Sequence, residues 1–239
     1  MKKIQKFSRI LLKLSGESLM GPNHFGIHLK TIERICDEIK QVIDLGIEVC
    51  IVIGAGNIFR GVSEAAYDLN RTSADYMGML GTVINSLALD SILQKKGIKA
   101  KTLSAIPMMP ICESYSQPKA LKLINENYTV IFAAGTGNPF FTTDTAASLR
   151  AAEMSCDAIF KGTLVDGVYD SDPKIYSKAK KFKKLSHKSV IKKDLKVMDM
   201  AAISLARDND IPILIFSINH PKGLLNVING TGPHTIIGN

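Results

Sequence analysis

Short continuous apolar runs alternate with longer amphipathic stretches along the chain, a pattern typical of a parallel β-sheet covered by helices. Runs of β-branched and other apolar residues predict strands at 9–14, 48–53, 100–103, 129–133, 158–161, 213–216 and 235–237. Apolar residues at helical spacing predict helices at 31–45, about 75–96, 118–127, 145–154, 186–193, 199–209 and 221–229. Thr143 is the predicted N-cap of the fourth helix, and the polar stretch 166–184 predicts a loop with a hairpin.

The alternation of strands and helices predicts a single α/β domain over the 239 residues. Its sheet should be mainly parallel, with helices on both faces. In such sheets, ligands bind at the carboxyl ends of the strands. The segments that follow the strands are therefore the places to look for chemistry.

Composition agrees with an ordinary globular protein, since 46% of the residues are hydrophobic and 22% are charged. The basic N-terminus is followed by an apolar run that Lys13 interrupts, which is too short for a signal peptide. We therefore expect no membrane segment and a cytoplasmic location. The four cysteines are widely spaced in apolar stretches, which predicts reduced, packed thiols at Cys36, Cys50, Cys112 and Cys156.

The net charge of +8 favours anionic partners such as nucleotides. Ten lysines lie within residues 174–196. A solvated surface is the favoured interpretation of this tract, because it lacks interleaved arginines. A nucleic-acid-binding face is the alternative.

Two glycine-bearing segments follow the first two predicted strands. In the first, Lys13 lies within an apolar strand, so it either extends to solvent at an edge or meets an anion, while Ser15 and Gly16 can present backbone N–H groups to a phosphate. The second is residues 54–61, with three glycines and Arg60, and it favours phosphate binding over a plain turn. It is not a dinucleotide-binding fingerprint, because a phenylalanine stands in the third glycine's place.

Two further segments combine groups suited to a nucleotide. Residues 135–144 hold glycines, three threonines, two phenylalanines and an aspartate; the alternative is an N-capped helix with Phe140 and Phe141 in the core. In residues 162–173, Tyr169 could stack on a base and Asp172 could accept from a ribose or adenine, although a surface hairpin is equally plausible.

Several other kinds of site are excluded or disfavoured by the sequence. It contains no Gly-Lys-Ser or Gly-Lys-Thr, so it is not a P-loop kinase. His24 and His28 are four residues apart, but Gly26 lies between them and no third ligand is evident. We therefore expect no metal site made by protein side chains alone.

The motifs taken together resemble the amino acid kinase family, and within it the bacterial uridylate kinases. They run in family order over nearly the whole chain: KLSGES at 13–18, GAGNIFRG at 54–61, SAIPM at 104–108, AGTGNPFFTTDTAA at 134–147, LVDGVYDSDP at 164–173 and LKVMDMAA at 195–202. The resemblance implies a three-layer α/β/α sandwich that moves the γ-phosphoryl group of MgATP onto UMP, with Mg²⁺ entering as MgATP. The N-terminal part would hold mainly UMP and the C-terminal part mainly ATP.

The resemblance also implies roles for individual residues. The catalytic residues would be Lys13, Arg60 and Asp144, with Asp144 orienting the lysine. Binding of ATP would involve Lys13, Leu14, Ser15, Gly16, Gly56, Arg60, Thr163, Tyr169 and Asp172. Binding of UMP would involve Ala55, Asp75, Thr136, Gly137, Asn138, Pro139, Phe140, Phe141, Thr142 and Thr143. Activation by GTP would involve Gly21, Pro22, Asn23, His24, Phe25 and Gly26.

By the same resemblance the protein would be a homohexamer inhibited by UTP. Ala55 departs from the family, which often has a third glycine there; its methyl group is tolerable if φ stays negative. Two rival functions are a relative that phosphorylates a carboxylate or carbamate, and a nucleic-acid-binding regulator that uses the lysine tract.

Overall fold

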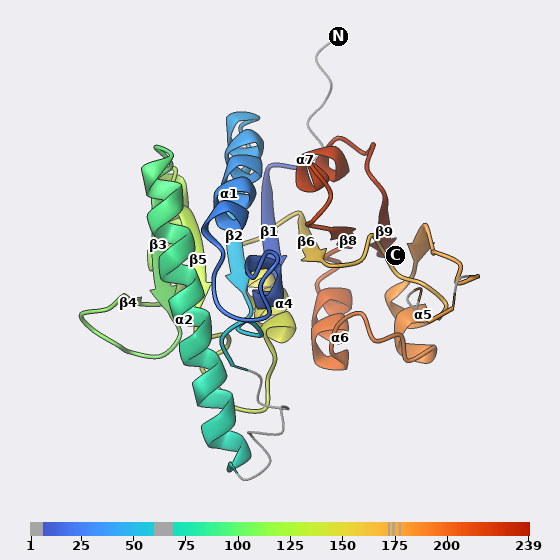
Figure 1. Cartoon of the computed structure of the whole chain (residues 1–239), viewed down its shortest axis with the longest axis horizontal. Helices are drawn as coiled ribbons and strands as arrows, with labels where there is room; N and C mark the ends of the chain where they lie inside the picture. The colour runs from blue at the N-terminus through green and yellow to red at the C-terminus, as the bar shows by residue number, and fades with distance from the viewer. Residues whose placement is uncertain (1–6, 60–68, 172, 174, 177) are drawn as a thin grey trace.

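This computed structural model describes residues 7–59, 69–171, 173, 175–176 and 178–239. Its strands form a single β-sheet. The sheet has nine strands in the order β4-β3-β5-β2-β1-β6-β8-β9-β7 (Figure 1). The strands are β1 Arg9–Leu14, β2 Glu48–Ile53, β3 Ala100–Ser104, β4 Glu113–Ser114, β5 Thr129–Ala133, β6 Ala158–Thr163, β7 Lys184–Leu185, β8 Ile213–Ser217 and β9 His234–Ile237.

All strand pairs are parallel except β8–β9, so the prediction of a mainly parallel sheet is confirmed. The central strand β1 lies between β2 and β6, with Lys13 paired in register with Val52 on one side and Lys161 on the other. The register therefore sets two lysines side by side at the carboxyl end of the sheet.

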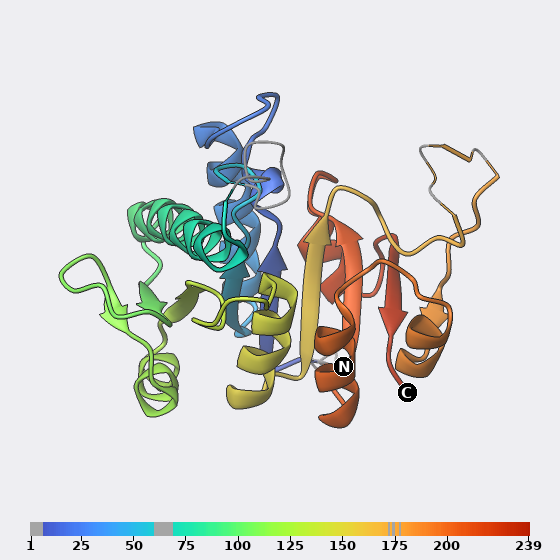
Figure 2. The same cartoon turned by 90° about the horizontal axis from the view of Figure 1, so that it is seen from below.

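Helices cover both faces of the sheet (Figure 2). They are α1 Leu29–Asp44, α2 Arg71–Lys95, α3 Gln117–Asn125, α4 Thr143–Glu153, α5 His187–Lys192, α6 Met200–Asp208 and α7 Gly223–Ile228, with a short 3-10 helix, η1, at Gly16–Leu19. One apolar core contains side chains of α1, α2 and α7, and the other contains side chains of α3, α4, α5 and α6. The three-layer α/β/α sandwich is therefore the observed fold.

Helix boundaries differ from the prediction where capping side chains set them. The helix α2 begins at Arg71 rather than near 75, because the Asn70 side chain accepts from the Thr72 N–H. The predicted N-cap at Thr143 is wrong, because Thr142 is the N-cap of α4 and its hydroxyl accepts from the Asp144 N–H. The cap therefore lies one residue earlier than predicted, and Asp144 lies in the first turn of the helix.

The four cysteines are free and buried, as predicted. Among the described residues, one helix, α2, is long and apolar enough to cross a membrane, by length and composition only. However, 56% of its most apolar window is buried inside this fold. Packing against the sheet accounts for much of its apolar character.

Candidate active site

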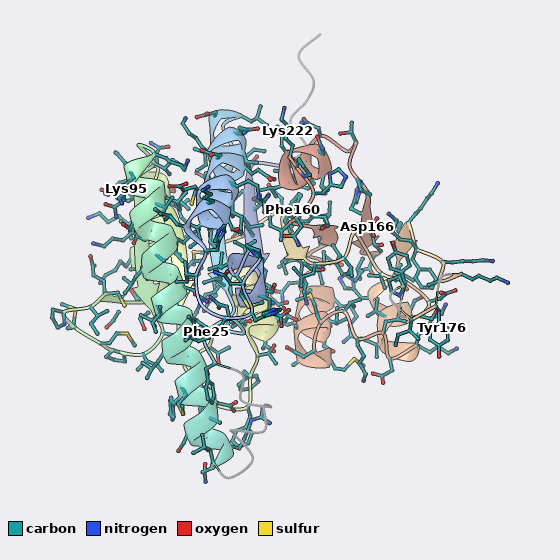
Figure 3. The ribbon with its side chains drawn as sticks, in the orientation of Figure 1. Phe25, Lys95, Phe160, Asp166, Tyr176 and Lys222 are labelled. Carbon is teal, nitrogen blue, oxygen red and sulfur yellow. The ribbon has the colours of Figure 1, made fainter. Side chains whose placement is uncertain are left out.

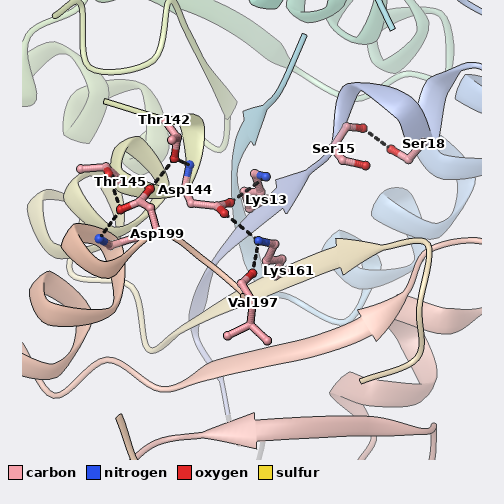
Figure 4. A network of polar contacts seen from close by, with 10 residues as sticks. Lys13, Ser15, Ser18, Thr142, Asp144, Thr145, Lys161, Val197 and Asp199 are labelled. Carbon is pink, nitrogen blue, oxygen red and sulfur yellow. Dashed lines mark hydrogen bonds and ion pairs between the residues drawn. The ribbon is translucent and has the colours of Figure 1, made fainter. Parts of the chain in front are cut away.

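A lysine–aspartate–lysine cluster lies at the carboxyl ends of β1 and β6 (Figure 4). Lys13 Nζ lies 2.7 Å from Asp144 Oδ1, and Lys161 Nζ lies 2.7 Å from Asp144 Oδ2. Lys161 also donates to the carbonyl oxygen of Val197. All three charged side chains are largely buried, so two cations share one carboxylate in a site with an excess positive charge.

The electrostatics of this cluster keep the aspartate ionised. Burial alone would raise the pKa of Asp144, but the charges and hydrogen bonds of Lys13 and Lys161 outweigh it and hold that pKa below its ordinary value. Burial lowers the pKa of Lys161 against the opposing effect of Asp144, and the Lys13 cation adds to the lowering. An added anion beside the lysines would relieve their mutual repulsion.

The paired Asp144 carboxylate predicts a pH dependence of folding stability. Its folded-state pKa is depressed, so its contribution is present above about pH 4, the ordinary aspartate range, and is lost as the pH falls through the folded-state pKa. We expect the urea midpoint of the wild type to fall more steeply on acidification than that of Asp144→Asn. The exposed Asp44, paired with Lys40, provides Asp44→Asn as a control with the wild-type slope. Equal slopes for the wild type and Asp144→Asn would contradict this expectation.

Next to Lys13, the corner that follows β1 (residues 15–16) meets the corner that follows β2 (residues 54–57). A Cβ added at Gly16 would lie 2.6 Å from the Gly56 nitrogen and 2.8 Å from the Gly54 oxygen, so only glycine fits there. The Ser15 hydroxyl is buried and has no hydrogen-bond partner among the described residues. Buried hydroxyls are normally bonded, so this oxygen fits a site that a ligand completes.

A cavity of about 250 Å³ lies between α2 and the corners after β2 and β5. It brings together several residues expected to bind UMP: Ala55, Asp75, Thr136, Phe141, Thr142 and Thr143. Sequence reasoning did not identify Phe59, Gly78, Met79 or Thr82, which also line it. Gly137, Asn138, Pro139 and Phe140 belong to the same loop without lining the cavity.

The loop at 136–143 is held from several sides. Its Phe140 N–H donates to Asp75 Oδ2 (2.8 Å), and Phe140 has a left-handed φ of 71°, which is rare for a bulky residue. The alternative that places both phenylalanines in the core is wrong, because Phe140 is 68% exposed and Phe141 is 51% exposed. At the other end of the loop, Asp199 accepts from the hydroxyls of Thr142 and Thr145.

Ala55, the departure from the family pattern, fits its place. It has a negative φ, because it is not among the residues with positive φ. A Cβ added at Gly81 of α2 would lie 2.9 Å from the Ala55 Cβ. The methyl group of Ala55 therefore fills space that the helix leaves open at Gly81.

A second cavity, of about 510 Å³, lies beyond the ends of β6 and β8. Tyr169 lines it, and the hydrogen bond from its hydroxyl to Asp166 raises the pKa of Tyr169 to about 12. Residues 217–221, which sequence reasoning did not identify, supply Ser217, Asn219, His220 and Pro221 to the wall. Thr163 lies at the end of β6, where its hydroxyl bonds the backbone of Val165.

The other residues expected at the site either have a position in the structure or lie outside the residues that it describes. Arg60 and Asp172 lie outside the described residues. Leu14 is buried at the end of β1. The 21–26 segment is a turn between η1 and α1, in which Phe25, labelled in Figure 3, is 70% exposed. In the part of the chain that the structure describes, no cluster of three His, Cys, Asp or Glu side chains could hold a metal ion.

Lys161 is the most important group that sequence reasoning did not identify. The signal was available, because Lys161 follows the apolar run 158–160 near the carboxyl end of its strand, as Lys13 follows the apolar run 10–12 in the first strand. Both lysines are largely buried near the carboxyl ends of their strands, and their ammonium groups contact the same aspartate. Asp199 was likewise visible within LKVMDMAA, but its contact with Thr142 joins residues far apart in the sequence.

Comparisons with known proteins agree with this geometry. Residues 8–217 match the Amino acid kinase family. The Uridylate kinase of Bartonella bacilliformis is 53% identical over 232 residues, which cover 97% of each chain. The Uridylate kinase of Cereibacter sphaeroides is 51% identical over 229 residues, or 96% of this chain and 93% of that one.

Solved structures of two UMP kinases have the same fold as this chain over nearly its whole length. The UMP kinase from Bacillus anthracis has a TM-score of 0.92 and 40% identity, covering 97% of this chain and 96% of that chain. The UMP kinase from Ureaplasma parvum has a TM-score of 0.92 and 37% identity over the full length of both chains. The fold, the strand-end cluster and these matches together establish that the chain belongs to the amino acid kinase family.

Proposed function

We propose that this protein is a uridylate kinase, which transfers the γ-phosphoryl group of ATP to UMP and gives UDP and ADP in pyrimidine nucleotide biosynthesis. The observation that carries the proposal is the position of the Lys13–Asp144–Lys161 cluster. It lies over β1 and β6, between the smaller cavity over β2 and β5 and the larger cavity over β6 and β8. A cationic centre between two cavities suits transfer between two bound nucleotides.

The reaction needs positive charge more than it needs a base. The phosphate of UMP is largely ionised at neutral pH, so its oxygen can attack the γ-phosphorus without losing a proton to the protein. Negative charge then grows on the transferred group and on the leaving ADP oxygen. Lys13 and Lys161 stabilise this charge, and Asp144 holds both ammonium groups in place.

The two cavities take different nucleotides in this proposal. UMP occupies the smaller one, with Asp75 near its ribose and the 136–143 loop around its base and phosphate. ATP lies along Ser15, Gly16 and Gly56, with its base in the larger cavity beside Tyr169. The N-terminal part of the single domain thus binds mainly UMP, and the C-terminal part binds mainly ATP.

A metal ion enters with ATP, and we propose that it is Mg²⁺. Both oxygens of Asp144 are engaged by lysines, so the donor set of this cluster suits phosphate rather than a resident cation. Phosphate oxygens and water would hold the ion, which neutralises charge on the ATP phosphates when bound.

A coupled assay with MgATP tests the function directly. UMP should be phosphorylated in preference to CMP and dUMP, and glutamate, aspartate and carbamate should not be phosphorylated. The exposed, threonine-rich loop that faces Asp75 supports a nucleotide acceptor. Activity on a carboxylate or carbamate without activity on UMP would overturn the proposal.

We also propose that the protein is a cytoplasmic homohexamer that GTP activates and UTP inhibits. Support for self-association comes from one face of α2, which exposes a stripe of large apolar side chains. Their exposed fractions are Tyr76 43%, Met77 41%, Leu80 53%, Ile84 49% and Leu87 36%. Such a stripe can pack against the same stripe of a second copy about a two-fold axis. We propose that GTP binds at the 21–26 turn.

Charging this α2 stripe should weaken the assembly. In Leu80→Glu combined with Ile84→Glu, like charges would be buried against the same charges of the partner, so the sedimentation coefficient should fall. Leu45→Glu is the matched control, because Leu45 is 46% exposed at the end of α1 and lies outside the stripe. A wild type that sediments as a monomer, or a double variant with wild-type mass, would refute the role of this face.

A further inference from the structure

Behind the two phosphate-facing corners lies a pair of buried asparagines. Asn57 is 2% exposed and Asn85 is fully buried. Asn57 Nδ2 donates to Asn85 Oδ1 (2.9 Å), and Asn85 Nδ2 donates to Asn57 Oδ1 (2.7 Å). The two side chains thus form a closed, reciprocal amide pair between the β2 corner and α2.

Each amide uses its second N–H on a backbone carbonyl. Asn85 donates to the Gly54 oxygen (2.8 Å), and Asn57 donates to the Gly26 oxygen (2.9 Å). The Gly26 N–H in turn donates to the Asn57 carbonyl oxygen (2.8 Å). The pair therefore joins three separate segments: the β2 corner, the helix α2 and the 21–26 turn.

The same pair lies directly behind the β1 corner. A Cβ added at Gly16 would lie 2.5 Å from Asn57 Oδ1, which is its nearest neighbour. The Gly54 N–H donates to the Leu14 oxygen (2.9 Å), so the two corners are also bonded through their backbones. Glycine corners are conformationally free, and something rigid must fix where their N–H groups point.

We propose that Asn57 and Asn85 are positioning residues for phosphoryl transfer, a role that rests on the proposed kinase function. They hold the Gly54–Gly56 corner against Ser15 and Gly16, and they bind the 21–26 turn into the same unit. An apolar pair of similar size could fill the space. It would leave the buried Gly54 carbonyl without this donor, and a buried carbonyl without a partner is costly.

The substitution Asn85→Asp tests this role with little change of shape. It replaces the donor amide nitrogen with an oxygen that faces the Gly54 and Asn57 oxygens. Repulsion should displace the corner, and kcat/KM should fall about 100-fold, since misplacement by about 1 Å costs that much. Protonation of the introduced carboxylate would restore one donor. The ratio of variant to wild-type kcat/KM should therefore rise as the pH is lowered from about 8 to about 6, because burial among carbonyls raises a carboxyl pKa.

The control is Ser86→Ala, at the next position of α2. Ser86 is fully buried but donates only to Thr82 O within its own helix (2.8 Å), so kcat and KM should stay at wild-type values. An Asn85→Asp enzyme with wild-type kcat and KM at about pH 8 would overturn the proposal, whatever its melting temperature. The wild-type assay with UMP separates this failure from failure of the proposed function.

Should Asn85→Asp not fold, hydrogen exchange on the wild-type enzyme decides the matter. A non-hydrolysable ATP analogue would order the corners, and the amide pair would pass that order to the Gly26 N–H bond. Exchange at the Gly26 amide should slow roughly tenfold on binding. No change at Gly26, with the corner amides protected, would overturn the proposal.

Discussion

Turnover should fall by about 10²- to 10³-fold in Lys13→Ala, with the fold intact, as when one preorganised donor to developing charge is lost. Lys13 is one of the two lysines that pair with Asp144 in the described cluster, and Asp144 keeps Lys161 as a partner after the removal of Lys13. The loss should therefore appear in kcat rather than in stability. Steady-state kinetics with MgATP and UMP, together with urea denaturation, measure both quantities.

Lys96→Ala is the matched control for Lys13→Ala. Lys96 follows the last residue of α2, pairs with Asp37 and lies away from both cavities, so its kcat should stay at the wild-type value. Lys161→Ala should resemble Lys13→Ala. Near-normal turnover in Lys13→Ala would remove that lysine from the mechanism and leave Lys161 as the cation of the described cluster.

The largest loss of stability should come from Asp144→Ala. It leaves two buried ammonium groups side by side without their shared carboxylate, and breaking a buried ion pair costs about 3–5 kcal/mol. Turnover should also fall sharply, because neither lysine keeps its position. Urea denaturation gives the change in the free energy of unfolding.

Two further variants isolate the cause of that loss. Asp37→Ala breaks an exposed pair and should change stability by about 0–1 kcal/mol. Asp144→Ala combined with Lys161→Met removes one of the repelling cations, so it should regain part of the stability without regaining activity. A double variant as unstable as Asp144→Ala alone would show that charge repulsion is not the cause.

The main elements of the fold were predictable because their signals are local. Continuous apolar runs identified β1, β2 and β5 at their observed bounds, and helical periodicity identified the seven α-helices that the described residues form. The two-residue strands β4 and β7 were missed because they are too short to show a period. Element ends depended on single capping side chains, as at Asn70 and Thr142.

The site was predictable only where its residues lie in one strand-end segment. Lys13, the glycine corners and the 136–143 loop could be identified in this way, and the structure brings Asp75 and Thr143 to one cavity. Contacts between side chains of different strands could not be predicted. The pairing of Lys13 with Lys161 depends on the adjacency of β1 and β6, which are more than a hundred residues apart in the sequence.

The contact between Ala55 and Gly81 links two positions whose evolution should be coupled. One methyl group fits between the β2 corner and α2, and either position can supply it. Family members with glycine at the position of Ala55 should therefore tolerate alanine at the position of Gly81, while alanine at both should be rare. When alanine at one of the two positions is replaced by glycine, replacement of glycine by alanine at the other position should become selectively favourable.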